Sequence, residues 1–131
     1  MKRIPLPVAL AALVLFVPLL SGCLAAIGAG AALGVGAIEY ANGKLESMQD
    51  ISLARGWTAT QLAMGDLQYT IVSERKDALE AELVAREASD KKVSVHLKKM
   101  NDKTVKFTLR VGTFGDETKS RQILEKIQSH F

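Results

Sequence analysis

The feature that most constrains this 131-residue chain is a boundary near Gly43 that separates two kinds of sequence. Before Glu39 the only charged residues are Lys2 and Arg3, and all three prolines precede Cys23. Beyond Gly43 charged residues are frequent, and apolar residues follow strand and helix periods. A chain of this length holds one ordinary domain. We therefore expect a single soluble domain over residues 44–131, and we expect residues 1–43 not to belong to its fold.

The first part of the chain has the layout of a secretory signal that ends in a cysteine. A positive start, Met1–Arg3, is followed by a proline-interrupted apolar run over residues 4–20, which is short for a bilayer span of about 20 residues. Leu20-Ser21-Gly22-Cys23 resembles the bacterial lipobox, in which the cysteine thiol receives a diacylglycerol and becomes the new N-terminus after cleavage. We expect residues 1–22 to be a cleaved lipoprotein signal peptide and Cys23 to be lipidated. The alternative is a lone buried cysteine.

Lipidation of Cys23 determines the expected address of the protein and makes membrane lipid its first partner. Cys23 is the only cysteine, so an internal disulfide is impossible, and acylation removes a free thiol from an oxidising compartment. Two or three acyl chains, at about 0.8 kcal/mol per buried methylene, hold a protein on its membrane stably. The second residue of the mature chain is Leu24 and not aspartate, which by resemblance to sorting in Gram-negative cells favours the periplasmic face of the outer membrane.

Residues 23–43 form a glycine- and alanine-rich segment. Leu24–Ile38 contains no polar side chain, and Gly30 and Gly34 have the four-residue spacing that lets helices approach closely in lipid. Fifteen helical residues span only about 22 Å, against a hydrocarbon core of about 30 Å. We interpret the segment as a tether at the lipid surface. The alternative is an oligomerising contact through which the protein self-associates.

The sequence beyond Lys44 predicts an α+β fold. Three of its strand-like runs alternate apolar and polar residues, as half-buried antiparallel strands do. Short turns join consecutive strands, which therefore pair antiparallel. The expected order is strand, helix, four strands, helix, with both helices on one face of a sheet of four to five strands. The expected strands lie near residues 44–51, 69–74, 79–86, 93–98 and 105–111.

Two amphipathic helices are predicted from their caps and their apolar spacing. Ser52 is a suitable N-cap for the first helix, in which apolar residues recur at helical spacing as far as Leu67. Asp116 is a suitable cap for the second, which runs towards the C-terminus. We expect the core to contain Trp57, where the first helix meets the sheet, together with Leu109, Ile123 and Ile127.

The C-terminal part carries a distinctive pattern: Arg110-Val-Gly-Thr-Phe-Gly-Asp-Glu117, then Ser120-Arg121 and Ile123–Ile127. Together with the lipobox-like sequence and the glycine-alanine run, it resembles a family of small bacterial lipoproteins catalogued only as a domain of unknown function. Gly56 stands where that family tends to have a bulky apolar residue, and Gln68 where it often has glycine. The resemblance implies no activity, cofactor or partner. In fold alone, the strand order is also similar to the helix-grip modules of outer-membrane assembly lipoproteins.

Gly112, Thr113, Phe114 and Gly115 form the best candidate binding loop. The loop follows a strand and precedes a helix, a place where free backbone amides bind anions. It lacks the lysine and the later glycine of a phosphate-binding P-loop, and Asp116 would repel phosphate. Two interpretations remain: a partner- or anion-binding loop, and a tight turn with Phe114 packed inward. The turn is the simpler of the two.

No residue pattern predicts catalysis, a metal site or a cofactor. His96 lies on the polar face of an expected strand and His130 at an expected helix end, where solvated histidines are common. The spacings of zinc, redox and serine-hydrolase motifs are missing from the sequence. We therefore expect no enzymatic activity, no metal and no cofactor.

Charge gives a weak indication of partners. The net charge of +3 falls to about +1 without Lys2 and Arg3, and the basic residues lack an interleaved aromatic platform, so we expect no nucleic acid. A basic group around the last hairpin is suited to anionic lipid or glycan: Lys98, Lys99, Lys103, Lys106 and Arg110. We expect a non-enzymatic, membrane-anchored module that binds an envelope protein or glycan. The alternative is a structural envelope component assembled through the glycine-rich segment.

Overall fold

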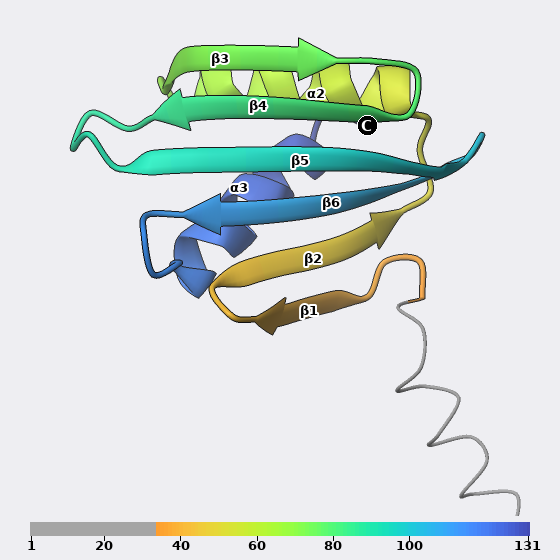
Figure 1. The fold of residues 1–131 in the computed structure, drawn as a ribbon, viewed down its shortest axis with the longest axis horizontal. Helices are drawn as coiled ribbons and strands as arrows, with labels where there is room; N and C mark the ends of the chain where they lie inside the picture. Colours follow the sequence, from red (N-terminus) through yellow and green to blue (C-terminus); the bar gives the residue numbers. More distant parts are fainter. Residues whose placement is uncertain (1–33) are drawn as a thin grey trace, which may run out of the picture. The chain divides into compact units, whose positions relative to one another are not determined.

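The computed structural model describes residues 34–131 as one sheet with two helices (Figure 1). The strands are β1 (Ile38–Ala41), β2 (Lys44–Gln49), β3 (Thr70–Lys76), β4 (Glu80–Arg86), β5 (Lys92–Asn101) and β6 (Thr104–Val111), and the helices are α2 (Leu53–Asp66) and α3 (Glu117–Gln128). The expected signal peptide, residues 1–22, and Cys23 lie outside the described residues. Within residues 34–131, neither helix has the length and apolar character needed to cross a membrane.

All neighbouring strands pair antiparallel, in the spatial order β1-β2-β6-β5-β4-β3. The α+β class is confirmed, but the prediction of four to five strands is wrong, because β1 adds a sixth. This strand lies in the segment expected to be tether. It pairs with β2 through the two-residue turn Asn42-Gly43, in which both residues have positive φ (54° and 77°). That geometry is typical of a type I′ hairpin, and Asn-Gly is its preferred sequence.

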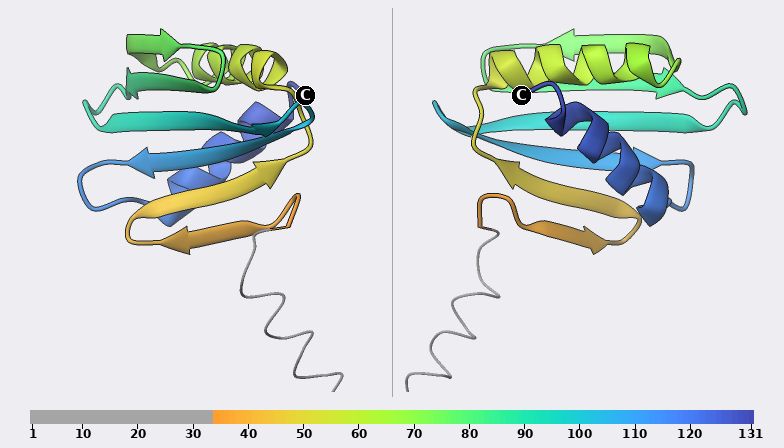
Figure 2. Two further views of the ribbon diagram at one scale, coloured as in Figure 1. Left: turned by 45° about the vertical axis from the view of Figure 1, so that its right-hand side comes forward. Right: turned by 180° about the vertical axis from the view of Figure 1, so that it is seen from behind.

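Both helices cover the same face of the sheet, as Figure 2 shows from two sides. α2 packs against β4 and β5, and α3 packs against β6 and β2. The prediction of two helices on one face is therefore confirmed. In β4, β5 and β6 the core side chains alternate with outward ones and are buried: Ala81, Leu83 and Ala85 in β4, Val93, Val95 and Leu97 in β5, and Val105, Phe107, Leu109 and Val111 in β6.

Trp57, predicted to lie where the first helix meets the sheet, is 8% exposed and belongs to the apolar core. Its neighbour Gly56 explains how closely α2 packs on the strands. A Cβ at this position would lie 3.1 Å from the Phe107 ring and 3.2 Å from Leu97 Cδ2, tighter than an ordinary contact. The glycine lowers helix propensity but permits the close approach. The other predicted core residues are buried as well: Leu109, Ile123 and Ile127.

The helix ends follow local rules. Ser52 and Asp116 cap α2 and α3 as predicted, since their side chains accept hydrogen bonds from the amides three residues later. After α2 the chain turns at Gln68, whose φ of 59° is left-handed, and the amides of Gln68 and the next residue bond back to carbonyls of the last turn. Glycine is the usual residue at this position. Gln68 therefore occupies a position whose backbone favours the glycine often found in the similar family.

Candidate functional site

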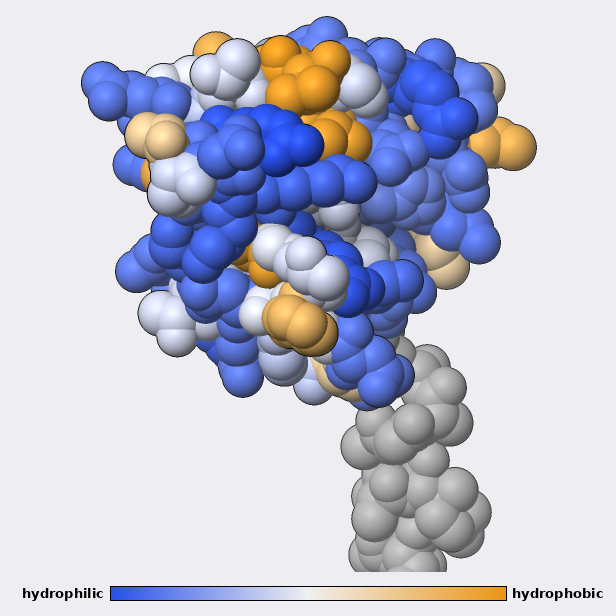
Figure 3. All heavy atoms as spheres, turned by 60° about the vertical axis from the view of Figure 1, so that its left-hand side comes forward, coloured by the Kyte–Doolittle hydropathy of each residue, from blue (hydrophilic) through white to orange (hydrophobic). Residues whose placement is uncertain are grey.

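The loop Gly112–Gly115, predicted as a candidate binding loop, joins β6 to α3 at one end of the sheet (Figure 1). We refer to it as the distal loop, because the described chain begins with Gly34 at the opposite end. Figure 3 views the side of the molecule on which the distal loop lies. Its surface is largely hydrophilic, and its hydrophobic residues form small separate groups. An exposed apolar side chain on this face therefore stands out from a polar background.

Two glycines fix the distal loop against the β1–β2 turn. Gly43 and Gly115 have φ angles of 77° and 85°, and their backbones pack against each other. A Cβ on Gly115 would overlap the Gly43 oxygen and lie 2.5 Å from Gly43 Cα. On the side of β6, the Arg110 guanidinium donates a hydrogen bond to the Thr113 carbonyl. The loop is therefore held from both sides.

Phe114 is 90% exposed, more than any other large apolar residue in residues 34–131. The loop does form a turn over residues 112–114, but the expectation that Phe114 packs inward is wrong. The physical reason is that Gly115 faces the domain and lies directly against Gly43 and the Tyr40 hydroxyl, which leaves no room for a ring. The loop presents an aromatic side chain to solvent on a fixed backbone.

Positive charge adjoins the distal loop. The side chain of Lys91 runs alongside Gly112. The carboxylates of the β4–β5 connection, Glu87 and Asp90, already pair with other cations, at 2.6 and 3.4 Å. Next to the loop lies a shallow hollow of about 280 Å³, lined by Lys92, Ser94, Arg110, Gly112 and Thr113. The β6 end of the distal loop is thus mainly basic.

The start of α3 is poorly suited to an anion. Asp116, the N-cap, accepts a hydrogen bond from the Lys119 amide at 3.0 Å, and Glu117 adds a second carboxylate in the first turn. Negative side chains already occupy the positive end of the helix dipole and repel a further anion. Of the two uses predicted for the loop, contact with a partner therefore fits the geometry better than anion binding.

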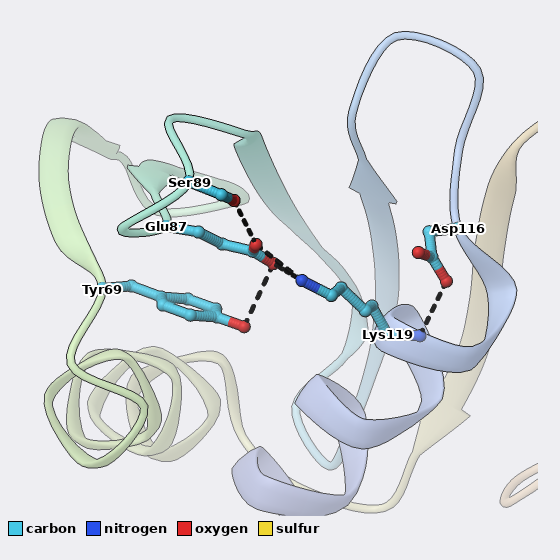
Figure 4. A network of polar contacts seen from close by, with 5 residues as sticks. All are labelled: Tyr69, Glu87, Ser89, Asp116 and Lys119. Atoms are coloured by element: carbon cyan, nitrogen blue, oxygen red, sulfur yellow. Dashed lines mark hydrogen bonds and ion pairs between the residues drawn. The ribbon is translucent and has the colours of Figure 1, made fainter.

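An ion pair between the buried Glu87 and the partly exposed Lys119 lies beside the first turn of α3, and sequence reasoning missed it (Figure 4). The Glu87 side chain, only 6% exposed, accepts hydrogen bonds from Lys119 Nζ at 2.6 and 2.8 Å. It also accepts hydrogen bonds from the Ser89 hydroxyl at 3.0 Å and the Tyr69 hydroxyl at 3.3 Å. The cluster joins the α2–β3 connection, the end of β4 and α3. It thereby fixes the helix that follows the distal loop.

The pKa shifts in this cluster keep each ionisable group in its ordinary protonation state at neutral pH. Burial alone raises the pKa of Glu87, but hydrogen bonds from Lys119, Ser89 and Tyr69, with the Lys119 charge, outweigh it and lower that pKa below its ordinary value. The hydrogen bond to Glu87 raises the pKa of Lys119, and burial followed by the Glu87 charge raises the pKa of Tyr69. At neutral pH the pair is ionised and the phenol protonated. We interpret the cluster as a structural clamp.

The strand pattern holds a signal for Glu87. Ala81, Leu83 and Ala85 point inward, and Glu87 is the next position in the same alternation. A carboxylate at an inward position needs a buried hydrogen-bonding partner. The partner itself, Lys119, lies 32 positions away, so no sequence spacing identifies it.

The two histidines lie in different places. His96 Nε2 is 3.7 Å from Glu80 Oε2 on the open face of the sheet, and His130 Nε2 is 2.6 Å from Asp66 Oδ2 at the end of α2. Among the residues that the structure describes, no three His, Cys, Asp or Glu side chains are grouped to hold a metal ion. Neither histidine is brought to the distal loop.

We expect Glu87→Gln to remove a pH-dependent part of the stability. Because the folded state lowers the pKa of Glu87, its contribution is present above the ordinary value of about 4.3 and is lost as the pH falls through the folded pKa. Lys119, with a raised pKa, contributes below about 10.4 and loses this contribution only at higher pH. At neutral pH the variant should lose about 1–2 kcal/mol, since Lys119 is partly exposed.

Urea unfolding followed by circular dichroism at neutral pH and at about pH 3 measures this effect. Glu117→Gln is the matched control, because Glu117 pairs with Arg121 at 2.9 Å on the exposed side of α3 and should lose less than about 1 kcal/mol. A loss for Glu87→Gln that is equally large at both pH values would contradict the ionised clamp.

Comparison with known families extends this description. The model of a family described as "Protein of unknown function (DUF3568)" matches residues 6–130, nearly the whole chain. The match confirms the resemblance to a domain of unknown function. A search of the curated proteins finds no match.

Proposed function

We propose that this chain, which belongs to the DUF3568 family of proteins of unknown function, is a lipid-anchored envelope module that binds a protein partner through its distal loop. The anchor is the acylated Cys23 expected from the lipobox-like sequence, and the place is the periplasmic face of the outer membrane. The binding residues are Gly112, Thr113, Phe114 and Gly115. The proposal contains no catalytic step, no metal and no cofactor.

The exposure of Phe114 on a fixed loop carries this proposal. Moving an aromatic side chain from water into an apolar pocket contributes about 1.5–3 kcal/mol. The contact between Gly43 and Gly115 and the Arg110 hydrogen bond hold the loop in place before binding, so association loses little conformational freedom. A few well-packed anchors near the centre of an interface provide most of the energy of protein–protein contacts, and aromatic residues are frequent among them.

The surroundings of Phe114 indicate the character of the partner. Lys91, Lys92 and Arg110 place positive charge at the β6 end of the distal loop, whereas Asp116 and Glu117 follow Phe114 on the side of α3. An apolar pocket with aspartates or glutamates on the side that faces Arg110 would be complementary to this arrangement in both shape and charge. Because this side of the molecule is largely hydrophilic (Figure 3), one pocket suits it better than a broad apolar interface. We therefore expect a protein partner with a pocket for one ring and with acidic residues on the side of the pocket that faces Arg110.

We expect Phe114→Ala to abolish a crosslink that the wild-type chain forms with its partner in intact envelopes. Truncation of a central aromatic anchor costs about 2 kcal/mol or more, which weakens binding about 30-fold. Crosslinking of whole envelopes, with mass spectrometry of the adduct, measures the loss. Val72→Ala is the matched control, because Val72 is 56% exposed on β3, the edge strand far from β6. We expect this control to keep the adduct.

The anchor is tested in the same experiment. Cys23→Ser removes the acyl acceptor, so we expect the precursor to stay unprocessed and the adduct to be lost although the distal loop is unchanged. An adduct that survives Phe114→Ala would contradict the assignment of the loop. Adducts only between copies of this chain would favour the alternative, a structural component assembled through the glycine-rich segment. An adduct with polysaccharide would replace the protein partner by a glycan.

A further inference from the structure

The end of the domain opposite the distal loop is the end at which the described chain begins. Gly34 and Val35 precede β1 here, and the β3–β4 turn and the β5–β6 hairpin lie at the same end (Figures 1 and 2). Three exposed apolar side chains belong to these segments: Val35 (60% exposed), Leu79 (64%) and Met100 (48%). We refer to these three residues as the tether-side surface.

The backbone places Leu79 and Met100 beside each other. In the β3–β4 turn the Asp77 carboxylate accepts hydrogen bonds from the amides of Leu79 and Glu80, at 2.8 and 2.9 Å. The Lys99 amide donates to the Leu79 carbonyl at 2.8 Å, so Met100 follows directly where the hairpin approaches this turn. Leu79 lies in a turn, where Gly, Pro, Asn, Asp and Ser are the usual residues, and Met100 near the end of β5 is the exposed apolar residue beside it.

We propose that the tether-side surface rests in the headgroup layer of the membrane that holds the anchor. This rests on one part of the proposed function, the acylation of Cys23, and is independent of the partner of the distal loop. Residues 24–33 connect Cys23 to the described domain and contain no polar side chain. Such a segment is more stable at a lipid surface than in water. It therefore draws the end that contains Gly34 towards the bilayer.

The length of this connection limits the distance between the domain and the membrane. An extended chain advances at most about 3.6 Å per residue, so residues 24–33 place Gly34 within about 36 Å of Cys23. β5, with 10 residues, is itself about 34 Å long and runs from one end of the sheet to the other. The connection could therefore span the whole sheet, and the orientation rests on the exposed apolar side chains at the end that contains Gly34. The distal loop then faces the periplasm, where a partner has access to Phe114.

The positive and negative charges at this end are nearly equal in number. We therefore expect apolar contacts, and not net charge, to provide most of the binding energy of the tether-side surface to the membrane. One of the ion pairs here joins Lys99 to Asp102 at 3.1 Å. Lysine stems lie readily along apolar material while their ammonium groups stay in the polar layer. The membrane binding of a polybasic surface would require anionic lipid, whereas we expect the binding of the tether-side surface not to require it. The charged residues at this end include Lys76, Lys98, Lys99 and Lys103, with Asp50, Asp77, Glu80 and Asp102.

A fluorescent probe on the full lipidated chain tests the orientation. Because acylated Cys23 has no free thiol and is the only cysteine, Leu79→Cys and Met100→Cys each provide one reactive thiol for an NBD dye. Val72→Cys, at a position 56% exposed near the distal end of β3, is the matched control. The labelled proteins are placed in phosphatidylethanolamine–phosphatidylglycerol vesicles with a headgroup-nitroxide lipid. We expect quenching to be severalfold stronger at positions 79 and 100 than at position 72, and to persist in phosphatidylcholine vesicles.

The possible results separate this inference from the anchoring. Equal quenching at all three positions, in a protein that floats with the vesicles, would overturn the orientation and leave the anchor intact. Dye on the wild-type chain would reveal a free Cys23 and overturn both. A dye at position 79 that is shielded from iodide but not quenched by the nitroxide lipid would show that protein covers the surface, and would overturn the membrane contact. Circular dichroism of the labelled variants checks that each remains folded.

Discussion

Trp57→Ala is expected to lower the free energy of unfolding by about 3–5 kcal/mol. Trp57 lies on α2, is 8% exposed and belongs to the apolar cluster that joins both helices to the sheet. Removal of the indole leaves a cavity, because the surrounding side chains collapse only partly into it. The loss is a large share of the roughly 5–15 kcal/mol that stabilises a small domain.

Leu62→Ala is the matched control for this variant. Leu62 lies on the same helix but is 49% exposed, so its truncation should change the free energy of unfolding by about 1 kcal/mol or less. Urea unfolding of the full chain in mild detergent, followed by far-UV circular dichroism, compares the two. Similar losses for both variants, or none for Trp57→Ala, would contradict the packing of α2 against the sheet.

Strict alternation makes the central strands predictable from the sequence. In β4, β5 and β6 a shift of one residue would turn the whole inward set of side chains to water, so the pattern specifies both the strand and its buried face. Ser52 and Asp116 mark the starts of the helices because a side-chain oxygen satisfies an amide that has no partner within the helix. Strand alternation and helix capping depend on residues close together in the sequence, so both can be recognised without knowledge of the tertiary structure.

Strand β1 cannot be predicted from composition or from the pattern of apolar residues. Its four residues lie at the edge of the sheet and are mostly exposed, so no alternation marks them. The nearly uncharged sequence before Glu39 assigns the region to the tether. The informative signal is the turn, since Asn42-Gly43 provides the two positive φ angles that a tight hairpin requires. Turn chemistry here decides the structure where hydrophobic patterning does not.

The position of the distal loop in the chain can be predicted from the sequence, but the direction of its Phe114 side chain cannot. Its position between a strand and a helix follows from the glycines at its ends and the capping Asp116. The direction of Phe114 depends on the contact of Gly115 with Gly43, a residue far away in the sequence. The pairing of Glu87 with Lys119 has the same origin. Tertiary contacts of this kind leave no periodic trace in the sequence.

Gly115→Ala is expected to destabilise the domain by about 2–5 kcal/mol. The φ of 85° is left-handed, which costs a residue with a Cβ about 1–2 kcal/mol. The new Cβ would also lie 2.5 Å from Gly43 Cα and 2.7 Å from the Tyr40 hydroxyl. Backbone atoms cannot rotate aside as a side chain does, so the β1–β2 turn and the distal loop must separate, and such overpacking costs about 1–3 kcal/mol more.

Gly65→Ala is the matched control, because the same added carbon there meets no atom within 4 Å and lies in α2. Alanine improves helix propensity by up to about 1 kcal/mol, so this change should stabilise the domain while Gly115→Ala destabilises it. Urea unfolding of both variants measures the two signs. If both variants are less stable than the wild type, the loss at Gly115 cannot be assigned to its contact with Gly43. If Gly115→Ala unfolds at the same urea concentration as the wild type, the contact with Gly43 is contradicted. Because that contact holds Phe114 in place, Gly115→Ala should also weaken the partner crosslink under conditions in which the domain remains folded.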